Sequence, residues 1–266
     1  MKTKITLITL IFASLFTFTD VQAQRCGIIT NTAFAPGERI EFDLFFRMGI
    51  VRARAGRATF TIDEANLHGQ PVYKAQMTFG TTGAVNLLHS YHETTTAFMD
   101  KNLRPLLSTR ETQERSPLVE SHTFSYDGDQ VTIRAVRHIN DALRFDEVLV
   151  VDECTFDNFS ILLFVRNLDY SQMNAGDRKR VQFINGRRLI DMYVNFLGIS
   201  TVRVGGERHE VINISMTIFD EAFSNPTEAI SASLTNDANR IPIIINTDLR
   251  VGAVRAEMRS VSGVRN

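Results

Sequence analysis

Two histidines have a spacing that invites a metal-binding interpretation. His89 and His92 lie three residues apart, just ahead of the threonine run 94–96. On a helix they would share one face, but consecutive threonines favour a strand, where the two rings point to opposite faces. Rings on opposite faces cannot chelate one ion. We therefore predict ordinary surface or cross-strand histidines and no metal site.

Acidic residues recur between positions 141 and 157, and paired carboxylates can cleave a glycoside or bind calcium. No calcium-loop spacing is present, and the sequence does not give the distance between the carboxylates in space. Solvated loop charges are therefore the preferred interpretation, with a glycan-acting enzyme as the alternative. The residues are Asp141, Asp146, Glu147, Asp152, Glu153 and Asp157.

Common catalytic motifs are absent from the sequence. It contains no Gly-x-Ser-x-Gly elbow, no phosphate-binding loop and no dinucleotide fingerprint. We therefore predict no catalytic residues, no cofactor and a protein that is not an enzyme.

Four residues are candidates for contact with a ligand: Arg240, Asp237, Arg52 and Arg255. Arg240 follows Asp237 and Asn239, and an arginine at a cavity mouth would present a planar fork to an anion. The preferred interpretation is a turn in which the Asp and Asn side chains satisfy their own backbone. For the arginines in general, pairing with acidic residues across an exposed sheet face is favoured over an anion site.

Arg52 and Arg255 occupy matching positions of two similar stretches near the two ends of the chain. The stretches are FRMGIVRARAGR at 46–57 and LRVGAVRA at 249–256, each with a central glycine. We interpret them as two neighbouring strands, because adjacent terminal strands help to close a sheet and hide its edges. An internal duplication is the alternative, but no longer repeat supports it.

The first 23 residues have the features of a cleavable signal peptide. Two lysines precede an apolar run at 5–18, and a small-x-small cleavage site follows at 21–23. Cys26 follows an arginine instead of a small residue, which argues against lipidation. No later stretch is long and apolar enough to cross a bilayer. We therefore expect a periplasmic or secreted mature chain.

The mature chain, residues 24–266, is expected to form one β-rich domain. It contains no linker rich in Pro, Gly or Ser and no low-complexity tract. The net charge of −1 becomes −2 when two lysines and one aspartate leave with the signal peptide. This near-neutral charge provides no general attraction to nucleic acid, so we expect no such partner.

Cys26 and Cys154 are the two cysteines of the chain. In an oxidising compartment an even count favours one disulfide. Closure of so long a loop would stabilise the fold by about 4 kcal/mol in the chain-entropy model. Two buried free thiols are the alternative.

Alternating apolar and polar residues predict strands along most of the chain, as in ERIEFDLFF at 38–46. Asn185-Gly186 and Gly205-Gly206 predict tight hairpins, because these residues tolerate positive φ. One helix is predicted at 157–173, with Asp157 as its cap and apolar residues on most of its circumference. The predicted fold is mainly β: a large curved antiparallel sheet or partly closed barrel with one buried helix near 157–170.

Several segments together resemble domain-of-unknown-function family 3108, a family of exported bacterial proteins. They are the Gly37-Glu38 start of the first strand, the Leu103-Arg104-Pro105 turn, the helix ending at Arg166 before Gly176-Asp177, and the element from Asp237 to Pro242. The resemblance covers nearly all of residues 37–259 and differs most at Gly205-Gly206. It implies an exported, mainly β protein and brings no catalytic residues.

Three functions are consistent with these observations. The first is a non-enzymatic envelope protein that binds or carries an apolar or glycolipid-type ligand in a barrel-like cavity. The second is an enzyme that acts on envelope glycan through acidic residues. The third is a structural partner in an envelope complex, recruited through exposed strand edges.

Overall fold

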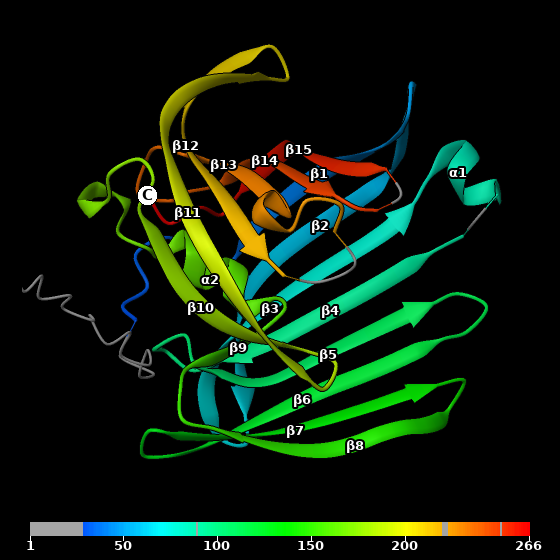
Figure 1. Ribbon diagram of the computed structural model, residues 1–266, viewed down its shortest axis with the longest axis vertical. Coiled ribbons are helices and arrows are strands. Elements are labelled where there is room, and N and C mark those ends of the chain that lie inside the picture. The colour runs from blue at the N-terminus through cyan, green and yellow to red at the C-terminus, as the bar shows by residue number, and fades with distance from the viewer. Residues whose placement is uncertain (1–28, 89, 220–222, 251) are drawn as a thin grey trace, which may run out of the picture.

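The computed structural model describes residues 29–266, apart from 89, 220–222 and 251 (Figure 1). In this part of the chain fifteen strands form one continuous sheet. The first eight strands are β1 (Glu38–Met48), β2 (Val51–Leu67), β3 (Gln70–Thr81), β4 (His92–Met99), β5 (Pro105–Gln113), β6 (Leu118–Asp127), β7 (Gln130–Ile139) and β8 (Ala142–Val151). The remaining strands are β9 (Thr155–Asp157), β10 (Arg178–Asn185), β11 (Arg188–Val204), β12 (Glu207–Ile218), β13 (Ile230–Thr235), β14 (Pro242–Asp248) and β15 (Ala253–Ser262).

The strand order shows that the two ends of the chain meet in the middle of the sheet. The order runs from β8 down to β1, then from β15 down to β9. All neighbours are antiparallel except β9 and β10, which are parallel. Leu44 of β1 lies opposite Ala256 of β15, and Arg47 lies opposite Ala253. The predicted adjacency of the terminal strands is therefore confirmed.

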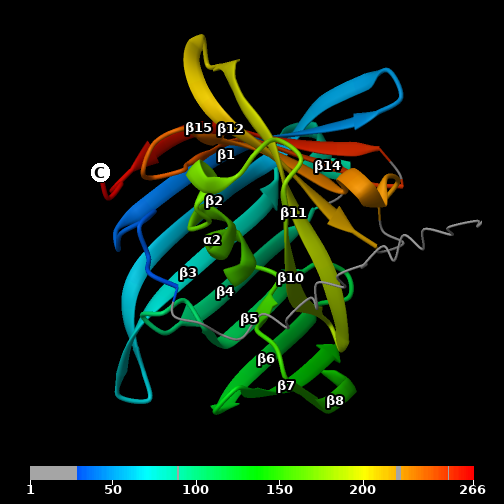
Figure 2. The ribbon, with the colours of Figure 1, turned by 60° about the vertical axis from the view of Figure 1, so that its left-hand side comes forward.

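The sheet curls into a nearly closed barrel-like fold around a short helix, α2 (Ser160–Arg166). This helix lies between the two runs of strands in both views (Figures 1 and 2). Leu163 packs against the cluster under β1 to β4, whereas Phe164 packs against the cluster under β10 to β13. The prediction of a β fold with one buried helix is confirmed.

The helix is shorter than the sequence suggested. Asp157 and the two residues before it form strand β9, in which Asp157 lies opposite Ile184. At the other end, Nδ2 of Asn167 donates to the carbonyl of Leu163 at 2.9 Å, and its Oδ1 accepts from the backbone N–H of Thr32 at 2.7 Å. A separate 3₁₀ turn, η1, covers Tyr170–Gln172. Two short elements absent from the prediction are α1 (Gly83–Leu88) and η2 (Pro226–Glu228).

The phase change predicted around Gly56 corresponds to a β-bulge. Leu44 lies opposite Gly56, and the next residue, Phe45, lies opposite Arg54, so Ala55 is the extra residue. A Cβ on Gly56 would lie 2.3 Å from the carbonyl oxygen of Gly80, so only glycine fits there. The bend at this bulge helps the sheet to curl.

The predicted hairpins also form. Gly205 and Gly206 are the two central residues of the β11–β12 turn, both with positive φ. The β10–β11 turn is one residue later than the sequence suggested, because Asn185 pairs with Arg188 and leaves Gly186 and Arg187 at the centre. The β11–β12 hairpin projects beyond the rest of the sheet (Figure 1).

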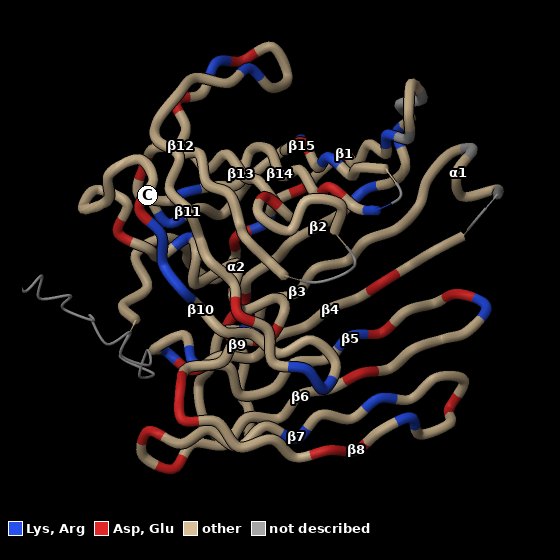
Figure 3. The backbone as a smooth tube through the Cα atoms, viewed as in Figure 1, with Lys and Arg blue, Asp and Glu red and all other residues tan. Residues whose placement is uncertain are grey.

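Charged residues are interspersed over the sheet (Figure 3). Some of them form ion pairs with residues on the neighbouring strand. Arg134 on β7 and Asp146 on β8 are joined by two hydrogen bonds of 2.8 and 2.6 Å. The prediction that arginines pair with acidic residues across strands is therefore confirmed for Arg134 and Asp146. Among the described residues, no helix has the length and apolar character that crossing a bilayer requires.

Candidate functional site

Two cavities lie inside the barrel, one on either side of the start of α2. The first, which we call the apolar cavity, has a volume of about 280 Å³, is partly open and is bordered by α2 and strands β10 to β12. Its lining is almost entirely apolar and includes Ile161, Leu162, Phe183, Met192, Met216 and Ile218. The pleat of the strands turns these side chains inward, because alternate residues of a strand point to one face.

The second space, the polar cavity, has a volume of about 190 Å³ and lies under strands β3 to β6. Thr95, Arg110 and Glu120 face it from positions directly opposite one another on β4, β5 and β6. Ser108 and His122 form the next cross-strand pair and also line it. Inward-facing positions elsewhere in the barrel are mostly apolar, so this strip of polar residues is an exception.

The charged groups of the polar cavity are fixed by ion pairs. Nη2 of Arg110 donates to Oε2 of Glu93 at 2.8 Å, and the hydroxyl of Tyr91 donates to the same oxygen. Burial raises the pKa of Glu93, but the hydrogen bonds from Arg110 and Tyr91 outweigh it and hold that pKa below its usual value. Glu120, only 2% exposed, is paired with Arg137 of β7.

His122 is held in one tautomer by the β10–β11 turn. Its Nε2 lies 2.6 Å from the carbonyl oxygen of Gly186, and a carbonyl only accepts, so Nε2 carries the hydrogen. Nδ1 then faces the hydroxyl of Ser108 at 3.4 Å. This distance is long for a hydroxyl hydrogen bond, which is usually about 2.7–2.8 Å. Ser108 and His122 therefore form a weakly bonded polar pair on the cavity wall.

Asp157 is the most unusual group in the polar cavity. Its side chain is buried, and Oδ1 accepts from the backbone N–H groups of Phe159 at 2.8 Å and Ser160 at 2.9 Å. Oδ2 is also buried and has no hydrogen-bond partner among the described residues. Burial raises the pKa of this carboxyl above its usual value, although the bonds from Ser160 and Phe159 act in the opposite direction. The prediction that Asp157 is a solvated loop charge is wrong.

Asn158 borders both cavities. It is exposed, and its Nδ2 donates to Oδ1 of Asn185 at 3.3 Å. The backbone turns sharply here from β9 into α2, with Asp157 holding the first turn of the helix. The apolar and polar cavities therefore share a bordering residue that solvent reaches.

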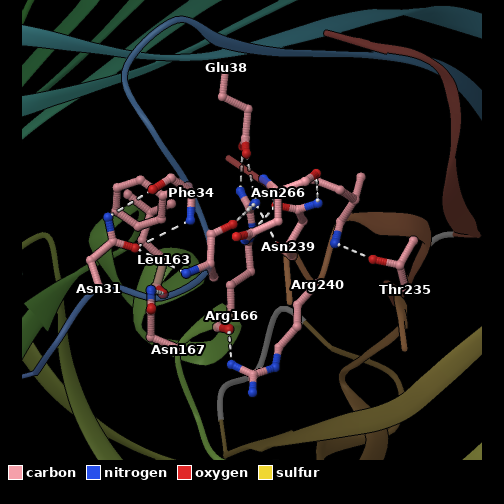
Figure 4. Close-up of polar contacts among 12 residues, drawn as sticks. Asn31, Phe34, Glu38, Leu163, Arg166, Asn167, Thr235, Asn239, Arg240 and Asn266 are labelled. Carbon is pink, nitrogen blue, oxygen red and sulfur yellow. Dashed lines mark hydrogen bonds and ion pairs between the residues drawn. The ribbon is translucent and has the colours of Figure 1, made fainter. Parts of the chain in front are cut away.

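A second buried polar cluster ties α2 to segments near both ends of the chain (Figure 4). Arg166, the last residue of α2, donates to both carboxylate oxygens of Glu38 at 2.6 and 2.9 Å. It also donates to the carbonyls of Ala33 at 3.1 Å and Asn239 at 2.9 Å. Its cation lies at the C-terminal end of the helix, where the helix dipole favours positive charge.

Two of the four ligand-contact candidates lie at this cluster, away from both cavities. Oδ1 of Asp237 accepts from the backbone N–H groups of Asn239 and Arg240, as the turn interpretation expects. The guanidinium of Arg240 donates to the carbonyl of Arg166 at 2.9 Å and lies over the ring of Tyr170. Both residues thus have structural contacts, and a role in ligand contact stays a prediction.

The other two candidates lie on the joined terminal strands. Arg255 of β15 donates to Glu257 at 2.6 Å and to Asn246 at 3.1 Å. Arg52 lies on β2 opposite Arg47, and its side chain lies outside the described residues. The four candidates are therefore not brought together in one site.

The predicted disulfide and the histidine pair each include one residue outside the described part of the chain. Cys154 is buried and disulfide-bonded, whereas Cys26 lies outside the described residues, so this pairing stays a prediction. His92 is exposed at the start of β4, and His89 lies outside the described residues. Within the described part of the chain, no three His, Cys, Asp or Glu residues gather in a way that would hold a metal ion.

Comparison with known proteins identifies the family of this chain. The family model for DUF3108, a protein family of unknown function, matches residues 41–259. The chain belongs to the DUF3108 family. The segments that carry the resemblance meet in three dimensions: Glu38, Arg166 and Asn239 all belong to the cluster in Figure 4.

The fold of this DUF3108 protein is similar to one solved structure, a β-barrel-like protein of domain of unknown function DUF1849 from Brucella abortus. The TM-score is 0.60 at 12% sequence identity, and the alignment covers 88% of the DUF3108 chain and 100% of the other chain. Identity this low shows a shared fold alone. No curated protein matches the sequence.

Proposed function

We propose that this protein is an exported, non-enzymatic envelope protein that binds an apolar or glycolipid-type ligand inside its barrel. The observation that carries the proposal is the pair of neighbouring cavities that both border Asn158, one apolar and one polar. Ligand pockets usually have volumes of about 300–1,000 Å³, and the two cavities taken together fall within this range.

The apolar cavity suits an alkyl chain. Its walls are formed by aliphatic and aromatic side chains from α2, β10, β11 and β12, and burial of a methylene group there contributes about 0.8 kcal/mol. An exported protein with such a cavity would shield the chain of an amphipathic molecule from water. The signal-peptide features of residues 1–23 support this location.

The test is binding of the fluorescent apolar probe N-phenyl-1-naphthylamine to the purified mature protein. Ile218 lines the apolar cavity, so Ile218→Phe fills part of it. Ile199→Phe makes the same change at a position that is 57% exposed and serves as the matched control. We expect the wild type and Ile199→Phe to bind one probe per chain, and Ile218→Phe to bind at least tenfold more weakly. Equal binding by all three proteins would reject the apolar cavity as the site.

One observation favours a second candidate function, hydrolysis of a glycoside. Glu93 and Asp157 line the same cavity, and their pKa values move in opposite directions, below and above the usual carboxyl range. This divergence is typical of an acid and a base that work together. Release of sugar from aryl glycosides that is abolished by Glu93→Gln, with the fold intact by circular dichroism, would support the enzyme and reject the carrier.

A further inference from the structure

We propose that the polar cavity binds the hydroxyl-rich head group of an amphipathic ligand, with Oδ2 of Asp157 accepting a hydrogen bond from a ligand hydroxyl. The inference rests on the proposed function, because it assigns the apolar cavity to the chain of the same molecule. It goes further by assigning the head-group site to named residues and by specifying the chemistry of the head group.

The first reason is the unpartnered oxygen of Asp157. A buried acceptor without a hydrogen bond destabilises the fold by about 1–3 kcal/mol. Asp157 is 1% exposed, its Oδ1 already accepts two backbone N–H groups, and its Oδ2 has no partner among the described residues. A ligand hydroxyl that donates to Oδ2 would supply the missing hydrogen bond and remove this destabilisation. Asp157 thus borders the polar cavity with one carboxylate oxygen unpaired.

The second reason is the mixture of donors and acceptors around that oxygen. Glu93, Glu120 and Asp157 supply carboxylate oxygens, Arg110 supplies N–H donors, and Thr95 and Ser108 supply hydroxyl groups. A hydroxyl group is both a donor and an acceptor, so a polyol or sugar can pair with every member of this set. A carboxylate or phosphate head would place its charge against three acidic side chains. A quaternary ammonium head has no N–H or O–H to donate to the unpartnered Oδ2 of Asp157.

The third reason is size and position. At about 30 Å³ for each water, a cavity of about 190 Å³ holds roughly six waters, which is comparable to glycerol or one sugar ring. The cavity also adjoins the apolar cavity at the exposed Asn158. An amphipathic molecule that enters there can place its head on one side of α2 and its chain on the other.

The test compares three amphiphiles with one chain and different heads: decyl β-glucoside, decanoate and decyltrimethylammonium. Their dissociation constants are measured by isothermal titration below the micelle concentration. We expect the glucoside to bind the wild type at least tenfold more tightly than either ion. Asp157→Asn retains an oxygen for the two backbone N–H groups and replaces the Oδ2 acceptor with a donor. We expect this change to raise the dissociation constant of the glucoside about tenfold. The dissociation constant of decyltrimethylammonium should change by less than about twofold.

The outcomes separate this inference from the proposed function. Equal binding of all three amphiphiles to the wild type would overturn the head-group site and leave the carrier intact. Binding of none would overturn both. If Asp157→Asn does not fold, Thr95→Val, which removes a hydroxyl from the same wall, replaces it and is expected to weaken the glucoside selectively. Loss of affinity for all three amphiphiles in that variant would overturn the assignment.

Discussion

Glu38 and Arg166 form a buried ion pair with two hydrogen bonds across 128 residues of sequence. Their side chains are 0% and 4% exposed, and the pair joins the start of β1 to the end of α2. Arg166 also reaches the segment before β14 through the carbonyl of Asn239. Arg166 therefore anchors the C-terminal end of the helix that lies between the two cavities.

Removing either partner of this pair should destabilise the fold strongly. Glu38→Gln leaves the buried cation of Arg166 without its counter-charge, and such a loss usually lowers the free energy of unfolding by about 3–5 kcal/mol. Urea unfolding followed by circular dichroism gives this value. Arg54→Gln, which affects an exposed pair with Asp43, is the control and should change stability by less than about 1 kcal/mol. Equal effects of the two variants would contradict this account of the helix.

The stability contributed by Asp157 should depend on pH. Its pKa is raised in the folded protein, so the native state binds a proton more tightly than the unfolded chain does. The stabilisation that Asp157 contributes is fully present below 3.8, the pKa of its carboxyl in the unfolded chain. It is lost as the pH rises through the higher pKa that this carboxyl has in the folded protein. Asp157→Asn removes this pH dependence, because the amide side chain of asparagine does not gain or lose a proton in this range.

The melting temperature of the wild type should therefore fall relative to that of Asp157→Asn as the pH rises from about 4 to 8. Differential scanning calorimetry of both proteins across this range measures the difference. Asp146→Asn is the control for an exposed carboxyl whose pKa is lowered, with the hydrogen bonds from Arg134 as the main cause. Its melting-temperature difference from the wild type should change little across this range, because a carboxyl with a lowered pKa loses its contribution only as the pH falls below about 4. A constant difference between the wild type and Asp157→Asn would show that this carboxyl is not buried.

A disulfide between Cys26 and Cys154 would connect the N-terminal segment to the loop before β9. In the chain-entropy model, closure of so long a loop contributes about 4–5 kcal/mol. We expect the intact mass of the mature protein to rise by two hydrogens on reduction. We also expect Cys154→Ser and Cys26→Ser to lower the unfolding free energy equally. Unequal losses would show that the two residues do not act as one bond.

Closing the point where the cavities meet should prevent ligand binding without affecting the fold. Asn158 is exposed, so Asn158→Trp adds bulk there without overpacking the core. Thr201→Trp, at an exposed position on β11, is the matched control. We expect the affinity for decyl β-glucoside to fall at least tenfold in the first variant and to stay unchanged in the second. Unchanged affinity in both would place the ligand path elsewhere.

Much of the fold followed from local patterns in the sequence. The alternation in 38–46, the phase change at Gly56 and the Gly205-Gly206 turn each predicted the element that forms. The similarity of the stretches near the two ends indicated that β1 and β15 are neighbours. Local chemistry determines these features, since strand period and positive φ depend on residues close together in the chain.

The cavities could not be predicted in the same way. Glu93, Arg110 and Glu120 come from three strands, and their common inward orientation depends on register that the sequence does not display. Asp157 was expected to be a helix cap among solvated acids. Its burial depends on how β9 packs in the folded chain, which the local sequence does not display. The sequence indicated that Gly37-Glu38 and Arg166 belong to two motifs of the family. It did not indicate that Glu38 and Arg166 form an ion pair, because they lie 128 residues apart.

The central claim is that the barrel holds an amphipathic molecule with a hydroxyl-rich head. Native mass spectrometry of the protein, expressed with its signal peptide and purified without detergent, tests it most directly. The account predicts one added mass per chain, identified after unfolding as a molecule with an alkyl chain and a sugar or polyol head. That mass should be retained by Ile199→Phe and lost from Ile218→Phe. Recovery of only the bare polypeptide mass from the wild type, or the same added mass on both variants, would contradict it.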